Sequence, residues 1–357
     1  MPSAAAPASS RVAVILLIHG DYARRYLAAC YASLARQTYP ASALRIFLVS
    51  NGTMAEDRAL VRRVAPNVCL LENRDNLGWS SGNNRAVREA LRQRYDYLVM
   101  LNVDTTVEPD WLARLVEAAD ARPDLHILQS TVLLGGGERL QTAGNRIHYL
   151  GYGYCTGYGR SRTAPPQPVP IDFASGAAML VKRQVFEAVG FFRDEYFLYY
   201  DDVEFCWRAR LAGFNVGIAA SSVCRHQYDF RDRLRMLFCF QRNRLLTLLT
   251  LERLRTILLT LPCLLVSELV VGCYFAMHGR GAEVRALAWY FLRPQTWAAI
   301  AVRRREVQRL RSRTDAEIVG RFAGRVVFAE IDGPAMRYVL NPLLACYWAL
   351  ARRLILW

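Results

Sequence analysis

The sequence lacks paired cysteines, and lysine is almost absent from it. Its nine cysteines are scattered singly and none forms Cys-x-x-Cys, which argues against a zinc knuckle and against a dithiol redox site. We therefore expect most of them to be reduced, buried and hydrophobic in behaviour. Reduced cysteines are typical of the cytosol, so a cytosolic setting is predicted.

The chain also lacks a secretory signal and an internal repeat. Met1–Ser10 is rich in alanine, proline and serine and is expected to be disordered. It has neither the basic start nor the apolar core of a signal peptide, and the apolar run that follows, Val12–Ile18, is too short to be one.

The charge of the chain is strongly positive. Its formal net charge is +15, from 46 basic against 31 acidic residues, and nearly all the basic residues are arginine. Arginine suits phosphate groups or an anionic membrane surface. A nucleic-acid partner is not predicted, because the sequence has no zinc-finger spacing and no RNP-like motif. With 357 residues and 53% hydrophobic content, we expect one large domain with an appendage, or two domains.

Apolar runs alternate with segments of helical spacing in the first part of the chain. This rhythm predicts an α/β domain with a mostly parallel sheet flanked by helices. The segment Asn73–Asn84 is predicted to be a polar, glycine-bearing loop. The predicted strands are Arg11–Ile18, Leu44–Val49, Val68–Leu71 and Tyr97–Leu101, and the predicted helices are Tyr22–Gln37, Asp57–Val64, Arg85–Arg94 and Asp110–Ala121.

The strand Tyr97–Leu101 ends abruptly in polar residues. Ligands of open α/β sheets lie just beyond the carboxyl ends of the strands, and Asn102 and Asp104 stand at such an end. Residues i and i+2 of an extended segment point the same way, so both can face one ligand. Oxygen atoms there suit a hard divalent cation that holds a diphosphate. On this stretch alone, a solvated loop after a strand is an equally good interpretation.

The pattern continues to about residue 229 and then changes. We expect a strand at Ile171–Val181, a helix at Lys182–Val189 and another at Phe205–Leu211, then short strands at Asn215–Ala219 and Ser222–His226. The domain is therefore predicted to cover residues 11–229. Residues 230–357 are predicted to form a helical, basic, membrane-associating region.

Two apolar segments of this C-terminal region bear on the membrane prediction. Thr256–Met277 is long enough to cross a hydrocarbon core, but Glu268 near its middle would cost a few kcal/mol at bilayer depth. We therefore favour a surface-lying or partly embedded helix over a clean span. The tail Met336–Trp357 resembles a second interfacial helix. The alternative is that both helices pack on each other as an ordinary core.

Six short sequence motifs follow one another along the chain. They are VAVILLIHG, LVSNG, NLGWSSGNN, MLNVD, YYDDVEFCWR and VCRH. Their order resembles that of the family 2 inverting glycosyltransferases of GT-A fold, and most of all their rhamnosyltransferase-like branch, over Arg11–Arg244.

The resemblance implies a metal site. In that family an acidic element holds the Mg²⁺ or Mn²⁺ ion that bridges the donor diphosphate. The matching triplet here has Asn102 in place of its first acid, so Asp104 becomes the expected metal ligand and Asn102 is expected to touch ribose or diphosphate. His226 matches a histidine that completes the metal site, although a histidine after a strand is by itself more often structural.

The resemblance also implies a donor-binding set. His19 stands after the first strand, where the family usually has Tyr-Asn, and Ser50 stands where an aspartate usually faces the base. Ser50 can still hydrogen-bond a pyrimidine, but its presence leaves the base undetermined. Gly78 and Asn84 match the loop that passes close to the nucleotide. Arg242 could clamp the diphosphate, or belong to a solvated basic helix face.

The pair Asp201–Asp202 matches the acidic element of the family that carries the catalytic base. A positioned carboxylate can deprotonate the acceptor hydroxyl as it attacks the anomeric carbon. By this match Asp202 is the base and Asp201 orients the acceptor or the base. Adjacent carboxylates can also raise one another's pKa. The alternative is that the pair only caps the helix that follows.

Together these expectations describe a metal-dependent inverting glycosyltransferase at the cytoplasmic face of the membrane. It would transfer a sugar, with rhamnose from a dTDP donor as one candidate, to a polyprenyl-linked or cell-surface glycan. The alternatives are a UDP-hexose transferase of the same fold and a non-catalytic basic adaptor for membranes or nucleic acid.

Overall fold

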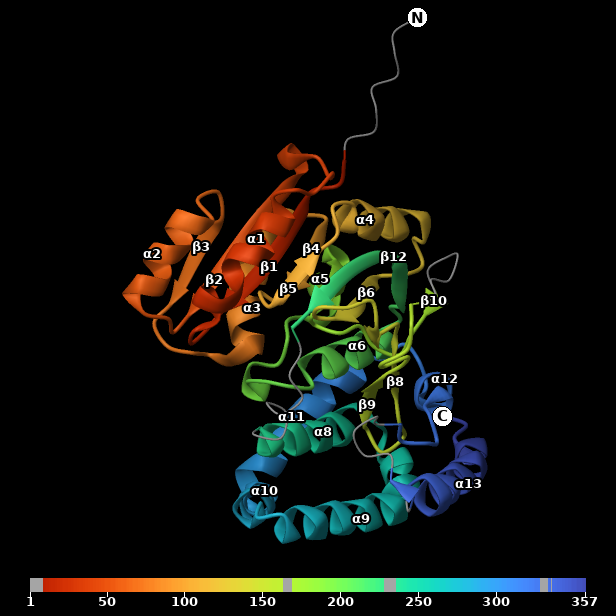
Figure 1. Cartoon of the computed structure of the whole chain (residues 1–357). Helices are drawn as coiled ribbons and strands as arrows, with labels where there is room; N and C mark the ends of the chain where they lie inside the picture. The colour runs from red at the N-terminus through yellow and green to blue at the C-terminus, as the bar shows by residue number, and fades with distance from the viewer. Residues whose placement is uncertain (1–8, 163–168, 228–235, 328–332, 335) are drawn as a thin grey trace, which may run out of the picture.

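The computed structural model describes residues 9–162, 169–227, 236–327, 333–334 and 336–357 (Figure 1). Residues 1–8, most of the segment expected to be disordered, lie outside the described residues. Residues 228–235, where the basic helical region was expected to begin, also lie outside them.

A large mixed sheet forms the centre of the molecule. Its strand order is β10-β12-β6-β11-β4-β1-β2-β3, with β5 on β12 and β7 on β6. The pairs among β1, β2, β3 and β4 are parallel, as is β6 with β12, while β11 runs antiparallel to its neighbours β4 and β6. The short strands β5, β7 and β10 also pair antiparallel, so the longest pairings of the sheet are parallel and its short edge pairings are not. The prediction of an α/β fold with a central sheet flanked by helices is confirmed. The strands are β1 (Val12–Ile18), β2 (Leu44–Asn51), β3 (Cys69–Asn73), β4 (Tyr97–Leu101), β5 (Thr105–Val107), β6 (Ile127–Leu134), β7 (Leu140–Thr142), β10 (Val169–Pro170), β11 (Ala178–Lys182) and β12 (Val216–His226).

Both faces of the sheet are buried, as a parallel sheet requires. Alternate residues of β1 enter two separate hydrophobic clusters. One cluster lies under α3 (Gly78–Arg92), α5 (Arg183–Val189) and α6 (Asp201–Leu211). The other lies under α1 (Ala28–Leu34), α2 (Ala55–Val64) and α4 (Trp111–Ala121). The sheet is therefore the middle of three layers.

The polar segment Asn73–Asn84 was predicted to be a loop, and most of it is helix instead. Helix α3 begins at Gly78, whose backbone N–H donates to Asn76 Oδ1 (3.0 Å). Asn83 Nδ2 donates to the carbonyl of Trp79 one turn earlier (2.8 Å). The helix propensity of this segment is low, but tertiary contacts outweigh it, and these contacts turn out to shape the site.

Two strand boundaries also differ from the prediction. The two short strands expected near residues 215–226 are one strand, β12, with an irregular register between Ala219 and Val223. The strand expected at Ile171–Val181 begins only at Ala178, because the residues before it turn across the end of the sheet.

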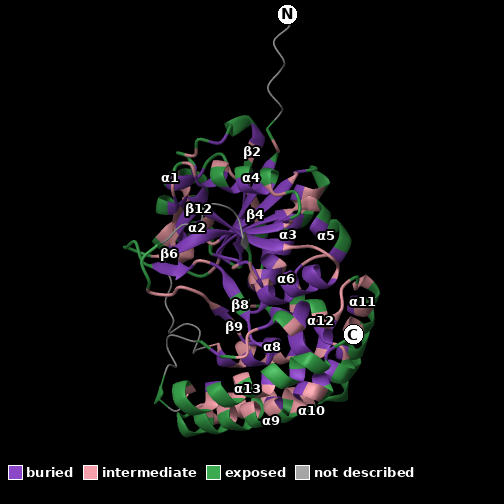
Figure 2. Ribbon diagram, turned by 90° about the vertical axis from the view of Figure 1, so that its right-hand side faces the viewer, coloured by how far each residue is buried: buried purple, intermediate pink, exposed green. Residues whose placement is uncertain are grey.

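The C-terminal part of the described chain is helical. Helix α9 runs along the edge of the molecule opposite the sheet, with α8 between them (Figure 1). Figure 2 shows α9 with a largely exposed outer face and α13 beside it. The helices are α8 (Leu237–Leu251), α9 (Leu254–Met277), α10 (Gly281–Leu292), α11 (Pro294–Leu310), α12 (Asp315–Ile318) and α13 (Asn341–Ala351).

Candidate active site

Asp104 and His226 meet at one edge of the sheet. His226 is the last residue of β12 and pairs with Thr105 of β5, directly after Asp104. His226 Nε2 lies 3.2 Å from Asp104 Oδ1, and both side chains are about nine-tenths buried. Two residues that are far apart in the sequence are thus in contact.

The partner of the other imidazole nitrogen bears on what this pair can bind. His226 Nδ1 lies 2.9 Å from Gln141 Oε1, an arrangement in which Nδ1 carries the proton and donates it. With the proton on Nδ1 alone, the Nε2 lone pair faces the Asp104 carboxylate. Two electron-pair donors that face each other are satisfied by a cation, and a second hydrogen bond of this kind commonly orients a metal-ligating histidine.

The spacing of the two donors fits an octahedral ion. Two ligands at right angles with bonds of about 2.1 Å lie about 3.0 Å apart, close to the observed 3.2 Å. Within the described residues, no three His, Cys, Asp or Glu side chains gather closely enough to hold a metal ion. An ion on Asp104 and His226 would therefore need diphosphate oxygens and water to complete its coordination.

His19 lies in the same region. Burial lowers the pKa of His19, and the negative charge of Asp104 opposes this shift. Its ring stacks on Tyr22 with the centroids 4.4 Å apart. The predicted donor-binding residue at the end of β1 is thus close enough to Asp104 to feel its charge.

A continuous set of contacts joins the end of β4 to Asp202. Asn102 Oδ1 accepts a hydrogen bond from Trp79 Nε1 (3.1 Å). The Trp79 indole lies over Gly176, where an added Cβ would come within 2.8 Å of it. The backbone N–H of Gly176 donates to Asp202 Oδ2 (3.0 Å). Asp202 and Asn102 therefore border one region, with Trp79 between them.

The two adjacent acids have different surroundings. Asp201 is buried and accepts a hydrogen bond from the Ser80 hydroxyl, whereas Asp202 is only half-buried. Burial raises the pKa of Asp201 to about 8, and the charge of Asp202 contributes less to this shift. Both acids lie in the first turn of α6, and neither is its N-cap. Burial, rather than the pairing of the acids, is thus the main cause of the raised pKa.

The segment that leads into these acids is strained. Phe197, Tyr199 and Tyr200 all have positive φ, at 62°, 68° and 67°. Such a conformation costs about 1–3 kcal/mol for each non-glycine residue and persists only where its surroundings enforce it. Two helices hold this segment, which we call the acid loop (Asp194–Tyr200).

Helix α3 holds one side of the acid loop. Asn84 is fully buried, and its Nδ2 donates to Phe192 O (2.9 Å) and to Asp194 Oδ1 (2.8 Å). Gly78 has φ +79°, and a Cβ there would lie 2.3 Å from the carbonyl oxygen of Phe197. Both residues were predicted to contact the donor. Their contacts are with the acid loop and the residues just before it, so the glycine allows the close approach of Phe197.

Helix α8 holds the other side. Asn243 Nδ2 donates to three carbonyl oxygens of the acid loop, those of residues 196, 198 and 199, at 2.9, 3.0 and 2.8 Å. Arg242 Nη2 donates to the carbonyls of Glu195 (2.8 Å) and Tyr196 (3.1 Å). Arg242 was predicted to clamp the diphosphate or to belong to a solvated helix face; in the structure it contacts the acid loop, and its diphosphate contact stays a prediction.

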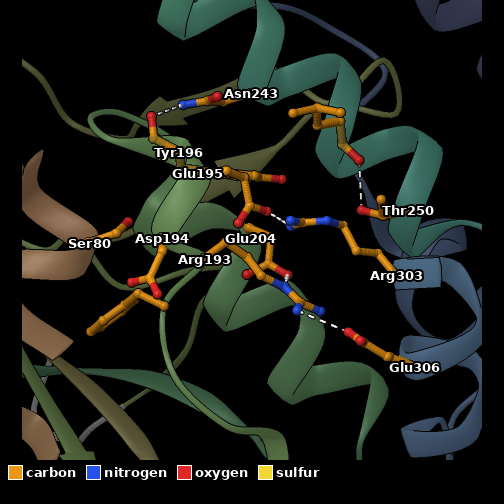
Figure 3. Close-up of polar contacts among 12 residues, drawn as sticks. Ser80, Arg193, Asp194, Glu195, Tyr196, Glu204, Asn243, Thr250, Arg303 and Glu306 are labelled. Atoms are coloured by element: carbon orange, nitrogen blue, oxygen red, sulfur yellow. Dashed lines mark hydrogen bonds and ion pairs between the residues drawn. The ribbon is translucent and has the colours of Figure 1, made fainter. Parts of the chain in front are cut away.

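Charged pairs extend this support to α11. Figure 3 shows Arg193 beside Glu306 (3.1 Å) and Arg303 beside Glu195, while Asn243 reaches Tyr196 from α8. Arg193 also contacts the buried Glu204 (3.4 Å). The C-terminal helices are therefore part of the support of the acid loop.

Ser50 is fully buried at the end of β2, and its hydroxyl contacts the Thr53 hydroxyl (2.5 Å). In this position it supports the β2 end rather than facing a base directly. Sequence reasoning did not assign roles to Asn243, Ser80 or Trp79. The Arg-Asn dipeptide at 242–243 was a usable signal for the first, whereas Ser80 and Trp79 become recognisable only once α3 is seen to be a helix.

Known proteins resemble this chain in sequence and in fold. Residues 14–190 match the model of the Glycosyl transferase family 2. Through this segment the chain belongs to glycosyltransferase family 2. It is 28% identical over 231 residues to the N-acetylglucosaminyl-diphospho-decaprenol L-rhamnosyltransferase of Mycobacterium tuberculosis, covering 58% of this chain and 73% of that one.

A second relative and a solved structure agree with this family. The low-salt glycan biosynthesis hexosyltransferase Agl10 of Haloferax volcanii is 26% identical over 162 residues, which are 42% of this chain and 49% of that enzyme, so only about half of its length is matched. The structure of GalNAc-T7 with UDP, GalNAc and Mn²⁺ matches with a TM-score of 0.55 at 14% identity, over 69% of this glycosyltransferase and 48% of that chain. This structural match supports the GT-A-like fold. The family match makes residues 14–190 a glycosyltransferase domain, which argues against the adaptor alternative.

Proposed function

We propose that this glycosyltransferase inverts the anomeric centre of a nucleotide-diphosphate sugar, with Asp202 as general base and a divalent cation on Asp104 and His226. The observation that supports this most directly is the 3.2 Å contact between Asp104 and His226 at the sheet edge. The contacts through Asn102 and Trp79 bring Asp202 to the same edge.

Asp202 takes the proton of the acceptor hydroxyl as its oxygen attacks the anomeric carbon. The new carbon–oxygen bond forms on the face opposite the diphosphate, the bond from the anomeric carbon to the diphosphate oxygen breaks, and the nucleoside diphosphate leaves. When bound, the cation neutralises the charge that develops on the diphosphate. The hydrogen bond from Gly176 N–H helps to hold the Asp202 carboxylate in place.

The buried Asp201 supports this role of Asp202. With a pKa of about 8, Asp201 is mostly protonated at neutral pH. A neutral Asp201 adds no negative charge beside Asp202, so the two adjacent acids have environments different enough for different roles.

The imidazole in the proposed ligand pair favours Mn²⁺ over Mg²⁺. Mg²⁺ prefers oxygen ligands and octahedral geometry, whereas a nitrogen ligand is better accepted further along the divalent series. Both ions remain compatible with the site, and Mn²⁺ is our first candidate.

For the donor and acceptor we propose a dTDP- or UDP-linked hexose, with rhamnose as the first candidate, and a lipid-linked glycan. The support is the name of the mycobacterial relative, a rhamnosyltransferase that acts on a decaprenol-linked sugar. The name of the haloarchaeal relative, a hexosyltransferase of glycan biosynthesis, favours the UDP-hexose alternative equally.

We further propose that the enzyme works at the cytoplasmic membrane surface with α9 lying in the plane of the interface. Among the described residues, α9 is the helix long and apolar enough to cross a membrane, with a mean hydropathy of 2.1. Yet one stripe of it faces the protein: Thr256, Ile257, Thr260 and Leu264 are buried.

Two polar contacts hold the same stripe of α9. Glu268 pairs with the fully buried Arg244 of α8, and Ser267 contacts the hydroxyl of Tyr152 (3.1 Å). A helix held in this way along its length presents only its outer face to lipid. That face carries exposed apolar side chains, namely Leu254, Leu258, Leu265, Val266, Leu269, Val270 and Met277.

A donor panel tests the proposed function. Purified enzyme is titrated with UDP- and dTDP-sugars in Mn²⁺, in Mg²⁺ and in chelator, and the anomeric configuration of the product is read by NMR. We expect one sugar nucleotide to bind more tightly with Mn²⁺ and to give an inverted product. A retained configuration, or binding and turnover unchanged by chelator, contradicts the proposal.

A further inference from the structure

A cavity lined by arginines lies away from the proposed active site. Its volume is about 330 Å³, and it lies between α13 and the segment Arg321–Arg325. Arg146, Arg321, Arg325 and Arg352 line it, together with the apolar Phe322, Ala345, Trp348 and Ala349. We call it the arginine pocket.

The positive charge of the pocket is only partly balanced. Arg146 contacts Asp172 (2.9 Å), but the same carboxylate also pairs with Arg210 (3.3 Å). Arg321, Arg325 and Arg352 form no ion pair within 4 Å in the described part of the chain, and all three are exposed. Several guanidinium groups around one cavity repel each other unless an anion lies among them, and arginine suits phosphate in particular.

The wall of the pocket is rigid. Trp348 is buried, its Nε1 donates to Phe322 O (2.9 Å), and its ring stacks on Tyr149 at 4.5 Å. At Gly324 an added Cβ would lie 3.1 Å from the Trp348 ring and 3.2 Å from Ala345, so the glycine lets the segment pack closely on α13. The arginines are thus presented from a fixed frame.

The surroundings of the pocket point to a lipid. The helix that lines it, α13, and the turn after it expose Leu343, Leu350, Leu354 and Leu356. The apolar outer face of α9 lies in the same part of the molecule, beside α13 (Figure 2). The exposed leucines lie on the side of α13 away from the pocket-lining Ala345 and Trp348, so about one helix diameter, ~10 Å, separates the cavity from the apolar surface. A lipid can span this distance, with its phosphate in the cavity and its chains in the hydrocarbon.

We propose that the arginine pocket binds the phosphate group of an anionic membrane lipid and so fixes the enzyme on the bilayer. This rests on the proposed membrane location, and it adds a specific lipid site to it. The exposed apolar residues of α9 and α13 favour a lipid phosphate over free phosphate, because only a lipid brings acyl chains that can cover them.

The test is a calorimetric titration of the whole chain with dihexanoyl phosphatidylglycerol, a soluble short-chain lipid, and separately with inorganic phosphate. We expect saturable binding of one lipid per chain, at least about ten-fold tighter than inorganic phosphate. Because each charge-assisted hydrogen bond contributes about ten-fold or more, Arg325→Gln/Arg352→Gln should weaken lipid binding about 100-fold. The matched control is Arg285→Gln/Arg293→Gln, two exposed arginines of the α10 region that do not line the pocket; it should keep wild-type affinity.

Equal losses in both double variants, no loss in either, or inorganic phosphate binding as tightly as the lipid would overturn the proposal. Co-sedimentation with phosphatidylcholine vesicles, with and without phosphatidylglycerol, tests the lipid site in the arginine pocket separately from the membrane location. If wild type and Arg325→Gln/Arg352→Gln bind both kinds of vesicle alike, the pocket assignment fails and the membrane location stands. If no vesicle binds the wild type, both fail. Donor binding and turnover test the catalytic proposal independently.

Discussion

Asn243 is expected to control catalysis without touching the substrate. Its side-chain amide donates to three backbone carbonyls of the acid loop at 2.8–3.0 Å. The amide has two N–H hydrogens to share among the three carbonyls, so at about 1 kcal/mol for each hydrogen bond Asn243→Ala removes about 2 kcal/mol of support. That is similar to the strain of about 1–3 kcal/mol at each left-handed residue of the loop. The loop should therefore relax in the variant and carry Asp202 out of position.

The expected result of Asn243→Ala is a kcat lower by about 100-fold, because a misplacement of about 1 Å has an effect of that size. The KM for the donor should change little, since Asp104 and His226 lie on other elements. Steady-state kinetics and calorimetric donor binding measure the two effects separately. Asn243→Asp keeps the shape of the side chain but turns a carboxylate toward three carbonyl oxygens, so it should be at least as impaired.

The control for this prediction is Asn215→Ala. Asn215 Nδ2 also donates to a backbone carbonyl, that of Asp124 (2.9 Å), but it does so away from the acid loop. Its kcat should stay at the wild-type value. An Asn243→Ala enzyme that turns over normally while folded would refute the reasoning that α8 positions the acids.

Three further predictions follow from individual contacts. His226→Ala should weaken Mn²⁺ binding in the presence of nucleoside diphosphate by about 10–100-fold and reduce the preference for Mn²⁺ over Mg²⁺. Calorimetric titration with each ion measures both effects, and unchanged metal affinity would show that His226 is not a ligand. Glu268→Gln should lower the free energy of unfolding by about 2–3 kcal/mol, a value discounted from that of a fully buried pair because Glu268 is partly exposed; a neutral or stabilising effect in thermal unfolding would instead favour a helix α9 detached from Arg244. Asp201 has a folded-state pKa of about 8, above its ordinary value of 3.8, so its contribution to stability is fully present below about pH 4 and is lost as the pH rises toward 8. Asp201→Asn keeps an acceptor for Ser80 and should therefore gain stability relative to wild type between pH 5.5 and 8. A stability difference that is independent of pH would contradict the buried, protonated state of Asp201.

The sheet was predictable because its strands follow a simple rule. Val12–Ile18 and Tyr97–Leu101 are continuous apolar runs, and both are buried on both faces. The contact of Asp104 with His226 also agrees with the expected placement, since Asp104 lies in the turn after β4 and His226 ends β12 at the same sheet edge. Local patterns and the order of the motifs carry this information.

The roles of the polar residues around the acid loop were not predictable in the same way. Gly78 and Asn84 stand in a motif rich in small polar residues, which favours a loop by propensity. The structure makes this segment a helix because Asn84 and Gly78 contact residues more than 100 positions later in the chain. Periodicity does not report such distant partners.

Arg242 illustrates the same difficulty for charge. An arginine after an α/β domain of net positive charge suggests phosphate binding. In the structure its guanidinium donates to two backbone carbonyls of the acid loop, and the residues that follow within this loop include left-handed ones. Sequence alone did not reveal that the loop before Asp201 is strained.

The account rests on Asp202 acting as the base, and Asp202→Asn is the most direct test. Turnover and donor binding are measured side by side on the same preparation, with Mn²⁺ present. The substitution keeps an oxygen to accept the Gly176 hydrogen bond but removes the proton acceptor, so transfer should fall by about 100- to 10,000-fold while donor affinity stays at the wild-type value. Near-normal turnover of the Asp202→Asn enzyme would contradict the assignment.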